Sequence, residues 1–315
     1  MVSLNKSVTL AICTKNKTEH FAECIKSITA NSYSPFELLI VDSSSKEKSE
    51  IIKGMTTEFG GIYLRQEKEG LSCARNLAIS ASKGEIVIFT DDDCIVSPDF
   101  IWQHVTCYTL LQVACVTGRV LNPNPEDSHF EEFMSQDKGA GKKIFSLENK
   151  NIKEVLKAVP NIKQHGALKE SAPIPWCLGS GNNMSFRRDV FSKIGLFDEA
   201  LGAGTLAKGG EDLDIFFRLI CYGFLVEYNS QAIVNHYHEH KTVNVAHDYG
   251  RGAGVFMLKH RDDPYILLQF LGLIAKISFG VISSLASGNK SNFGIHISSL
   301  KGLFSSLWYG RLLKN

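Results

Sequence analysis

Short apolar runs alternate with helical spacing over the first 120 residues of the chain. Continuous apolar runs predict buried strands at Val8–Thr14, Glu37–Asp42, Ile62–Arg65 and Glu85–Thr90. Between and after them, apolar residues three or four positions apart predict helices at Glu19–Thr29, Ile51–Phe59, Leu71–Ser82 and Phe100–Leu111. This alternation predicts an α/β fold with a doubly wound, mostly parallel sheet flanked by helices.

Polar residues follow three of the predicted strands. They are Thr14-Lys15-Asn16, Asp42-Ser43-Ser44-Ser45 and Asp91-Asp92-Asp93. Ligands of open α/β sheets bind at the carboxyl ends of the strands. We therefore expect these three segments to converge on one site, although the sequence separates them.

The second half of the chain is less regular. Residues 122–172 are polar and irregular, and they predict a surface excursion or a lid. The pattern beyond them predicts a strand–turn–strand unit, a short helix, a flexible glycine-rich loop, a longer helix and a last strand, at Trp176–Phe186, Asp189–Ile194, Gly202–Gly210, Glu211–Tyr222 and Leu225–Val234.

Two apolar stretches follow near the C-terminus. Tyr265–Ser287 is 23 residues long, enough to span a bilayer, but Lys276 lies at its middle. A lone cation there opposes insertion by roughly 2.5–3.5 kcal/mol. Phe293–Leu313 mixes apolar, basic and aromatic residues, which suits a membrane interface. The pattern favours helices lying in or shallowly inserted into a membrane surface, with helices packed on the protein or a true span as alternatives.

Composition narrows the class of protein. The chain has 315 residues, 44% apolar and 21% charged, which excludes a disordered chain, a collagen-like chain and a disulfide miniprotein. A net charge of +1 gives no general case for a nucleic-acid partner. Residues 1–240 hold 25 Lys/Arg against 30 Asp/Glu, whereas residues 241–315 hold 9 against 3. The basic C-terminal region indicates contact with an anionic membrane surface, or else a soluble basic subdomain.

The cysteines and the N-terminus bear on location. None of the eight cysteines forms a CxxC pair and most lie in apolar runs, a pattern typical of reduced, buried thiols. The first apolar run is too short for a signal peptide. We expect a protein on the cytoplasmic side of the cell membrane, peripheral or shallowly inserted, and favour a purely soluble cytoplasmic location less.

Adjacent carboxylates after a buried strand point to a metal. Asp91, Asp92 and Asp93 repel one another, and a divalent cation relieves that repulsion. All-oxygen ligation suits Mg²⁺ or Mn²⁺, which bridge to phosphate oxygens. A solvated acidic loop or a helix cap is the alternative.

Other residues allow two interpretations each. Asp42 could accept hydrogen bonds from a ribose or base, or form an Asx-turn with the serines. Glu211 and Asp212 could be ordinary first-turn acids of a helix, or present a general base. The alternating histidines His236, His238 and His240 could supply a metal ligand or lie on the surface. A tryptophan such as Trp176 is more often a core residue than one that stacks on a ligand.

Taken in order, these segments resemble glycosyltransferase family 2, enzymes of the GT-A fold that transfer a sugar from a nucleoside diphosphate. The matching blocks are LAICTKNKTEHFAECIKSI, FELLIVDSSS, EGLSCARNLAISASKGEIVIFTDDDCIVSPDF, LGSGNNMSFRRDVFSKIGLFDEALGAGTLAKGGEDLDIFFRLICYG and IVNHYHEH. The resemblance covers roughly residues 7–260. One departure is Cys13, where the family often has Pro before the first-strand Thr.

The resemblance implies roles for individual residues. It implies Asp212 as catalytic base with Glu211 supporting it, and a Mn²⁺ or Mg²⁺ ion held by Asp91, Asp93 and His236. The implied donor-binding residues are Thr14, Asp42, Arg75, Asp92, Trp176 and Asn182. The implied reaction is an inverting transfer from a UDP- or GDP-linked sugar to a glycan or lipid-linked acceptor, in cell-surface polysaccharide or glycolipid assembly.

The implied organisation has three parts. Residues 1–120 form the nucleotide-sugar-binding half of a GT-A domain, residues 121–240 its acceptor-binding and catalytic half, and residues 241–315 a basic, apolar helical extension associated with a membrane.

Two other functions fit parts of the pattern. One is a nucleotide-sugar-binding protein without turnover, and the other is a metal-dependent nucleotidyltransferase.

Overall fold

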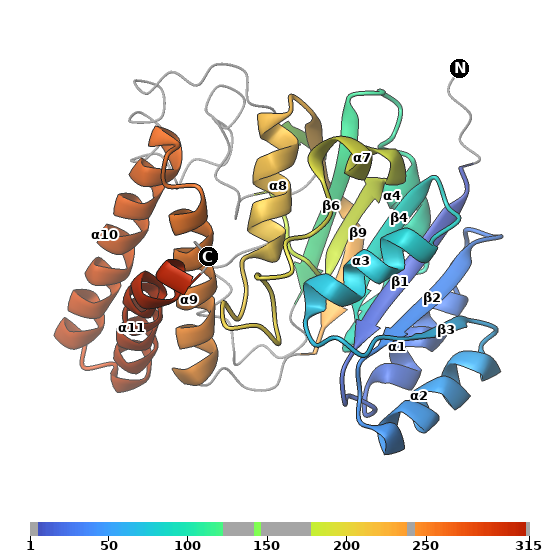
Figure 1. The fold of residues 1–315 in the computed structure, drawn as a ribbon, viewed down its shortest axis with the longest axis horizontal. Helices are drawn as coiled ribbons and strands as arrows, with labels where there is room; N and C mark the ends of the chain where they lie inside the picture. The colour runs from blue at the N-terminus through green and yellow to red at the C-terminus, as the bar shows by residue number, and fades with distance from the viewer. Residues whose placement is uncertain (1–5, 122–141, 146–177, 238–242, 313–315) are drawn as a thin grey trace.

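A computed structural model describes residues 6–121, 142–145, 178–237 and 243–312. In this part of the chain a twisted sheet lies between two layers of helices, and a bundle of three long helices stands beside it (Figure 1). The strands are β1 (Val8–Thr14), β2 (Glu37–Asp42), β3 (Ile62–Arg65), β4 (Ile86–Asp91), β5 (Cys94–Val96), β6 (Val113–Leu121), β7 (Lys142–Phe145), β8 (Asn183–Arg187) and β9 (Leu225–His236).

The helices follow the predicted order closely. Those of the α/β part are α1 (Phe21–Thr29), α2 (Lys46–Glu58), α3 (Leu71–Ala81), α4 (Phe100–Val105), the short 3₁₀ helix η4 (Arg188–Val190), α7 (Phe191–Ile194) and α8 (Glu211–Cys221). The bundle consists of α9 (Val243–Lys259), α10 (Pro264–Ala286) and α11 (Lys290–Leu312). The sequence pattern did not predict α9 as a separate helix.

The N-terminal strands form the predicted parallel sheet, in the order β3-β2-β1-β4. Their apolar runs are continuous because helices cover both faces of the sheet. Thr14 lies opposite Asp42 on one side, and Cys13 lies opposite Asp91 on the other. The polar residues that follow these strands therefore meet at one edge, as the sequence predicted.

The other half of the sheet is mixed. β8 runs antiparallel to both β4 and β6, and β6 runs parallel to β9. β5 and β7 pair antiparallel with β9. Parallel pairing thus holds for β1 to β4, and the sheet as a whole is less parallel than the sequence suggested. The reversal arises because β8 begins at Asn183 opposite Thr90, beside the carboxyl end of β4, and so runs back along that strand.

Three strands, β5, β6 and β7, were absent from the prediction, and β7 lies within residues 122–172, which were expected to be irregular. The helix predicted over Phe100–Leu111 ends at Val105, and β6 follows from Val113. The prediction counted Leu111 among the apolar residues of this helix, but Leu111 is 80% exposed and lies after the helix ends. Thr, Gly and Arg interrupt the apolar run of β6, and β5 has only three residues, so neither gives a clear strand signal.

The core lies on both faces of the sheet. Leu10 and Ile12 of β1 point into a cluster with α1, α2 and α4, whereas Ala11 points to the other face. That second cluster joins the sheet to α3, α7 and α8, where Phe216 is fully buried. α8 is therefore fixed against the sheet over its length, and its first residues reach the edge where the strand ends meet.

The three-helix bundle contacts the α/β part through α8, which stands between them in Figure 1. Phe217 of α8 packs edge-on against Phe256 of α9, 5.9 Å between ring centroids. Within the bundle α9 and α11 pack closely against each other where their residues are small. A Cβ atom at Gly250 would lie only 2.2 Å from the carbonyl oxygen of Ser299, so a larger residue would not fit there. Ile266–Ala286 is long and apolar enough to cross a membrane, and 17% of its most apolar window is buried.

Candidate active site

Asp93 is the best-paired carboxylate of the acidic segment. It lies in the turn between β4 and β5 and is 5% exposed. Its Oδ2 accepts a hydrogen bond from Lys17 Nζ at 2.5 Å, and its Oδ1 lies 3.0 Å from His236 Nε2. Burial opposes ionisation, but these partners hold the pKa of Asp93 far below its usual range. Asp93 is therefore a carboxylate at any physiological pH.

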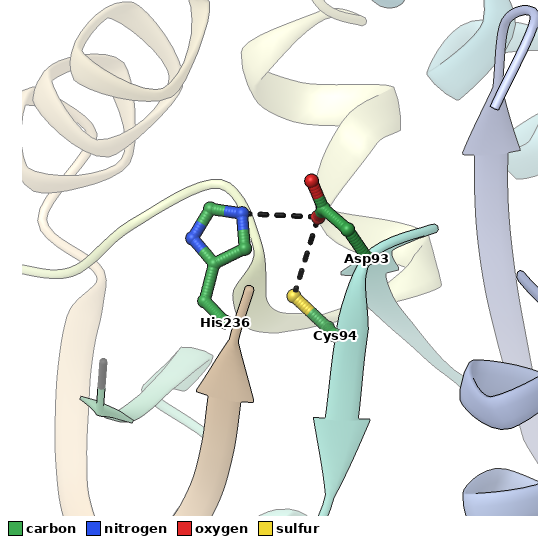
Figure 2. Close-up of side chains that lie close together, drawn as sticks. All are labelled: Asp93, Cys94 and His236. Atoms are coloured by element: carbon green, nitrogen blue, oxygen red, sulfur yellow. Dashed lines mark hydrogen bonds and ion pairs between the residues drawn. The ribbon is translucent and has the colours of Figure 1, made fainter. Parts of the chain in front are cut away.

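His236 reaches Asp93 because β9 ends beside β5. Cys94, the first residue of β5, is the register partner of His236. An oxygen, a sulfur and a nitrogen, from Asp93, Cys94 and His236, lie within 4.8 Å of one another (Figure 2). Burial raises the pKa of the Cys94 thiol well above its ordinary value, so the carboxylate and the imidazole are the available ligands.

The surroundings of this cluster fit a cation. Asn182 Nδ2 lies 2.9 Å from His236 Nδ1, while the buried Oδ1 of Asn182 has no hydrogen-bond partner among the described residues. A buried acceptor without a donor is costly. Among the described residues five carboxylates gather here, and the basic residues Lys17, Arg75 and His236 lie beside them. The carboxylates are Asp91, Asp92, Asp93, Glu211 and Asp212. The donor set therefore suits a divalent metal.

Asp92 and Asp91 differ in environment. Asp92 is 6% exposed and accepts a hydrogen bond from Thr14 Oγ1 at 2.6 Å. Burial, reinforced by the charge of Asp93, raises the pKa of Asp92 to about 7. Asp91 is more open, with a side chain 32% exposed, and its Oδ1 lies 3.7 Å from Arg75 Nη2. Asp91 is thus the member of the triplet that faces the open side of the site.

Arg75 connects the acidic strand end to the start of α8. Its side chain is 2% exposed, and its Nη1 donates to Glu211 Oε1 at 2.9 Å. Its Nη2 donates to the carbonyl oxygen of Gly181 at 3.0 Å. A Cβ at Gly181 would lie 2.7 Å from that guanidinium, which explains a glycine at this turn. Arg75 is therefore buried between Glu211, Asp91 and the Gly181 turn, and its contact with the donor stays a prediction.

Asp212 lies at the N-terminus of α8, after Gly210 in the left-handed region with φ +87°. Its Oδ1 accepts from the Leu213 N–H at 2.8 Å, and its Oδ2 from the Gly181 N–H at 3.2 Å. Burial, with the negative charge of Glu211 added, raises the pKa of Asp212 to about 7. A carboxylate with this pKa can both take up and release a proton near neutral pH.

The glycine-rich loop before α8 is held in place. The Leu71 N–H, at the start of α3, donates to Ala203 O at 2.9 Å, and Ser72 Oγ donates to Leu201 O at 2.7 Å. The composition of Gly202–Gly210 predicted flexibility, whereas the described loop is tied to α3. The segment after α7 thus reaches Glu211, at the start of α8, through a loop held against α3.

Asp42 is turned inward. It is fully buried, and it accepts hydrogen bonds from the Ser44 N–H at 2.8 Å and the Ser49 hydroxyl at 2.6 Å. Tyr63 and Arg65 also donate to it. Burial would raise the pKa of Asp42, but these hydrogen bonds lower it. Both interpretations of Asp42 are compatible with this arrangement, because the Asx-turn that it forms shapes the loop beside Thr14.

The sheet edge thus gathers most of the residues singled out from the sequence. Trp176, His238 and His240 lie outside the described residues. Sequence reasoning missed Lys17, although the polar TKNK segment after β1 was its signal. It also missed Asp214, two positions after Asp212, which is fully buried on α8.

Comparison with known proteins agrees with this geometry. The sequence profile of glycosyl transferase family 2 matches residues 9–195. The chain is 26% identical to a glucosyl-dolichyl phosphate glucuronosyltransferase of Haloferax volcanii, over 73% of this chain and 68% of that protein. It is 24% identical to the O-antigen chain rhamnosyltransferase RfbN of Salmonella typhimurium, over 84% and 76% of the two chains.

Solved structures show the same fold. A mannosyltransferase from Pyrobaculum calidifontis, in complex with GDP-Man and Mn²⁺, superposes with a TM-score of 0.67 at 15% identity, over 96% of this chain and 88% of that one. The fold is therefore that of the GT-A enzymes. The family profile spans more than half of the sequence, and the chain belongs to glycosyltransferase family 2.

Proposed function

We propose that this glycosyltransferase is an inverting enzyme that moves a sugar from a UDP- or GDP-linked donor to a hydroxyl group of a glycan or lipid-linked acceptor. The observation that carries the proposal is the pairing of two features at one sheet edge. One is Asp212, a helix-terminal carboxylate whose pKa is raised to about 7. The other is the ionised Asp93 beside His236. Arg75 ties the two sides together.

The acceptor hydroxyl donates its proton to Asp212 as its oxygen bonds to the anomeric carbon of the donor. The bond from that carbon to the diphosphate oxygen breaks on the opposite face, and the diphosphate leaves with the electron pair. The proton remains on Asp212 until water takes it. Backbone N–H groups of Gly181 and Leu213 orient the carboxylate for this step.

The residues at the other side of the site suit the donor. Thr14 and Asp92 lie at the ends of β1 and β4, where a parallel sheet places its ligands. Asp93 and His236, with Asp91 beside them, would hold Mn²⁺ or Mg²⁺. When bound, such an ion would offset the negative charge that develops on the leaving diphosphate.

Relatives support the substrate class. The glucuronosyltransferase of Haloferax volcanii is named for a dolichyl phosphate-linked glucose, and the Salmonella relative for the O-antigen chain. The Pyrobaculum calidifontis enzyme was solved with GDP-Man and Mn²⁺. We therefore place this chain in the assembly of polysaccharides or glycolipids.

A panel of nucleotide sugars tests the donor and the metal together. We expect one donor to raise the melting temperature only with Mn²⁺ or Mg²⁺ present, and to release its nucleoside diphosphate slowly by hydrolysis. Ligand at one hundred times Kd stabilises a protein by about 2.7 kcal/mol, which a thermal shift detects. Asp93→Asn should lose the metal-dependent part of the shift, because the ionised member of the cluster is gone.

Asp189→Asn is the matched control. Asp189 is exposed in η4, just after β8, and it lies beyond the end of the β4–β8 pairing where Arg187 is opposite Ile86. The site lies at the other end of that pairing, where Asn183 is opposite Thr90. The shift of Asp189→Asn should equal that of the wild type. A donor that binds and hydrolyses equally well in EDTA would refute the metal. A chain that responds to no donor would refute the whole proposal.

We further propose that the bundle lies on a membrane surface. Five large apolar side chains of α10 are 50–71% exposed, and their spacing puts them on one face of the helix: they are Leu267, Leu271, Phe279, Ile282 and Leu285. Trp308 of α11 is 64% exposed. Basic residues outnumber acidic ones 9 to 3 from residue 241 onward. Exposed apolar side chains in a basic region suit an anionic lipid interface.

Liposome sedimentation tests this contact. The protein should bind vesicles containing phosphatidylserine or phosphatidylglycerol, and Phe279→Glu combined with Leu285→Glu should release it, because two charges would enter the apolar face. Leu111→Glu, at an 80% exposed leucine of the α/β part, should bind like the wild type. Equal binding by the double variant would contradict the proposed face.

A further inference from the structure

We propose that α9 forms the acceptor side of the active site and that Tyr249 contacts the acceptor sugar. The inference rests on the proposed function and extends it to a helix in the C-terminal bundle. The sequence had predicted for that region a membrane-associated extension, with a soluble basic subdomain as the alternative, and no part in the active site. The packing of α9 on the residues that precede Asp212 carries the argument.

α9 touches the catalytic loop at a glycine. A Cβ at Gly210 would lie 2.6 Å from the carbonyl oxygen of Gly252, and a Cβ at Gly252 would lie 2.8 Å from backbone atoms of Gly209. The two backbones are therefore in direct contact immediately before Glu211. Any larger residue at Gly252 would push α9 away from the start of α8.

Tyr249 shares the face of α9 that makes this contact. Positions 249, 252, 256 and 260 form one stripe on a helix. Phe256 of this stripe is fully buried against Phe217 of α8, and His260 lies 2.7 Å from Asp214. α9 thus follows α8 from its first residue onward. Tyr249, one turn before Gly252, comes beyond the N-terminal end of α8, on the side of Asp212.

The electrostatic surroundings of Tyr249 agree with this position. Burial of the phenol, together with the negative charges of Asp212, Asp91 and Glu211, raises its pKa far above the ordinary value. These carboxylates act on Tyr249 because they are close to it. The hydroxyl remains protonated and can donate a hydrogen bond, and the residue as a whole is 41% exposed. An aromatic side chain with a polar tip suits a pyranose, which presents C–H groups to the ring and oxygens to the hydroxyl.

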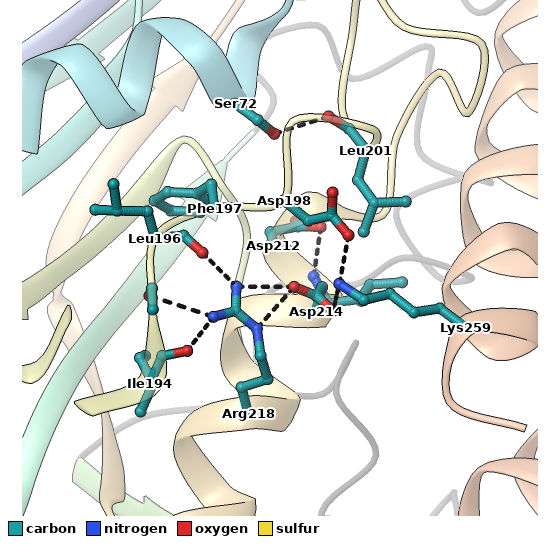
Figure 3. A network of polar contacts seen from close by, with 12 residues as sticks. Ser72, Ile194, Leu196, Phe197, Asp198, Leu201, Asp212, Asp214, Arg218 and Lys259 are labelled. Carbon is teal, nitrogen blue, oxygen red and sulfur yellow. Dashed lines mark hydrogen bonds and ion pairs between the residues drawn. The ribbon is translucent and has the colours of Figure 1, made fainter. Parts of the chain in front are cut away.

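A buried ion cluster fixes α9 relative to the catalytic helix. Asp214, on α8, is fully buried and accepts Lys259 at 2.7 Å, and Arg218 pairs with it at 2.8 Å (Figure 3). Lys259 also reaches Asp198 at 2.6 Å. Burial disfavours the charge of Asp214, but the hydrogen bond from His260 and the nearby cations lower its pKa to about 2. The cluster ties α9 to Asp214, which is two residues after Asp212 on α8. The fold therefore sets the distance from Tyr249, on α9, to the proposed base.

Steady-state kinetics with octyl glycosides as acceptors test the assignment, using the donor found by the nucleotide-sugar panel. Tyr249→Ala should raise the KM for the octyl glycoside by about tenfold or more, and Tyr249→Phe should raise it less, because the ring remains and one hydrogen bond is lost. The KM for the donor, its metal-dependent thermal shift and its slow hydrolysis should not change. Tyr222→Ala is the matched control, since Tyr222 is 61% exposed at the opposite end of α8.

A second variant tests the placement of α9 without touching Tyr249. Gly252→Ala should also raise the acceptor KM, because its Cβ displaces α9 from Gly209. Gly272→Ala, on α10, has no atom within 4 Å of its new Cβ and should behave like the wild type. Acceptor KM values within twofold of wild type for Tyr249→Ala would overturn the proposal. Failure of the wild type to bind or hydrolyse any donor would instead refute the proposed function, and this inference with it.

Discussion

Asp212→Asn is expected to abolish sugar transfer while leaving donor and metal binding intact. Asparagine has the shape of aspartate and can still accept a hydrogen bond from the Leu213 N–H, which is 2.8 Å from the native carboxylate. It cannot take a proton from the acceptor hydroxyl. Loss of a general base typically lowers the rate by 10²–10⁴-fold. The measurement is kcat for transfer, beside the metal-dependent thermal shift with the same donor.

Asp189→Asn serves again as the control and should transfer at the wild-type rate. The assignment of the base would fail in either of two cases. In one, Asp212→Asn loses donor binding, which would make Asp212 a binding residue. In the other, transfer continues within tenfold of the wild-type rate.

The pH dependence of the same reaction follows from the raised pKa of Asp212. Because that pKa is about 7, Asp212 is protonated and inactive as a base below it, so kcat should rise with pH through about 7. Glu211→Gln removes the neighbouring charge that raises the pKa, and the rise should move to lower pH. Asp92 also titrates near 7, but Asp92→Asn should alter donor binding and keep the rise in kcat. A profile unmoved by Glu211→Gln would contradict this account.

The sequence predicted well the edge at which β1, β2 and β4 end, because parallel strands carry their own signal. Continuous apolar runs that end in Thr14, Asp42 and Asp91 indicate both the strands and the edge at which they end. Once the order is βαβα, the register of a parallel sheet brings those ends together. The family and the GT-A fold are confirmed by the profile match and the structural neighbour.

The side of the site formed by α8 and α9 was less predictable, because its contacts join distant segments. Glu211 and Asp212 resemble the first-turn acids of any helix, and their partner Arg75 lies 136 positions before Glu211 in the sequence. α9 gave no strong amphipathic pattern, since glycines supply its contacts with Gly209 and with α11. Glycine has no side chain and adds nothing to a hydrophobic pattern, so the sequence does not reveal that α9 lies against the site.

Arg75→Met should destabilise the protein by about 3–5 kcal/mol, the usual effect of removing one partner from a buried ion pair. The variant leaves Glu211, 7% exposed, and Asp91 without the guanidinium that lies 2.9 and 3.7 Å from them. The carbonyl of Gly181 also loses its donor. Thermal unfolding measures the change, which should be on the order of 5–10 °C in melting temperature. Arg261→Met, which removes a surface pair at 3.9 Å, should change stability by less than about 1 kcal/mol.

A double variant separates the ion pair from simple packing. Arg75→Met combined with Glu211→Gln should recover part of the lost stability, because a neutral glutamine needs no cation beside it. If the double variant is as unstable as the sum of the two single variants, the loss comes from packing against Phe89 and Phe197 instead.

The two substitutions should also move the activity profile in opposite directions. Arg75 lowers the pKa of Asp212 and Glu211 raises it, so residual activity should shift to higher pH in Arg75→Met and to lower pH in Glu211→Gln. Unfolding alone would lower activity at every pH and would not reverse the shift. Opposite shifts would therefore establish that one buried ion pair both joins the halves of the site and sets the proton affinity of its base.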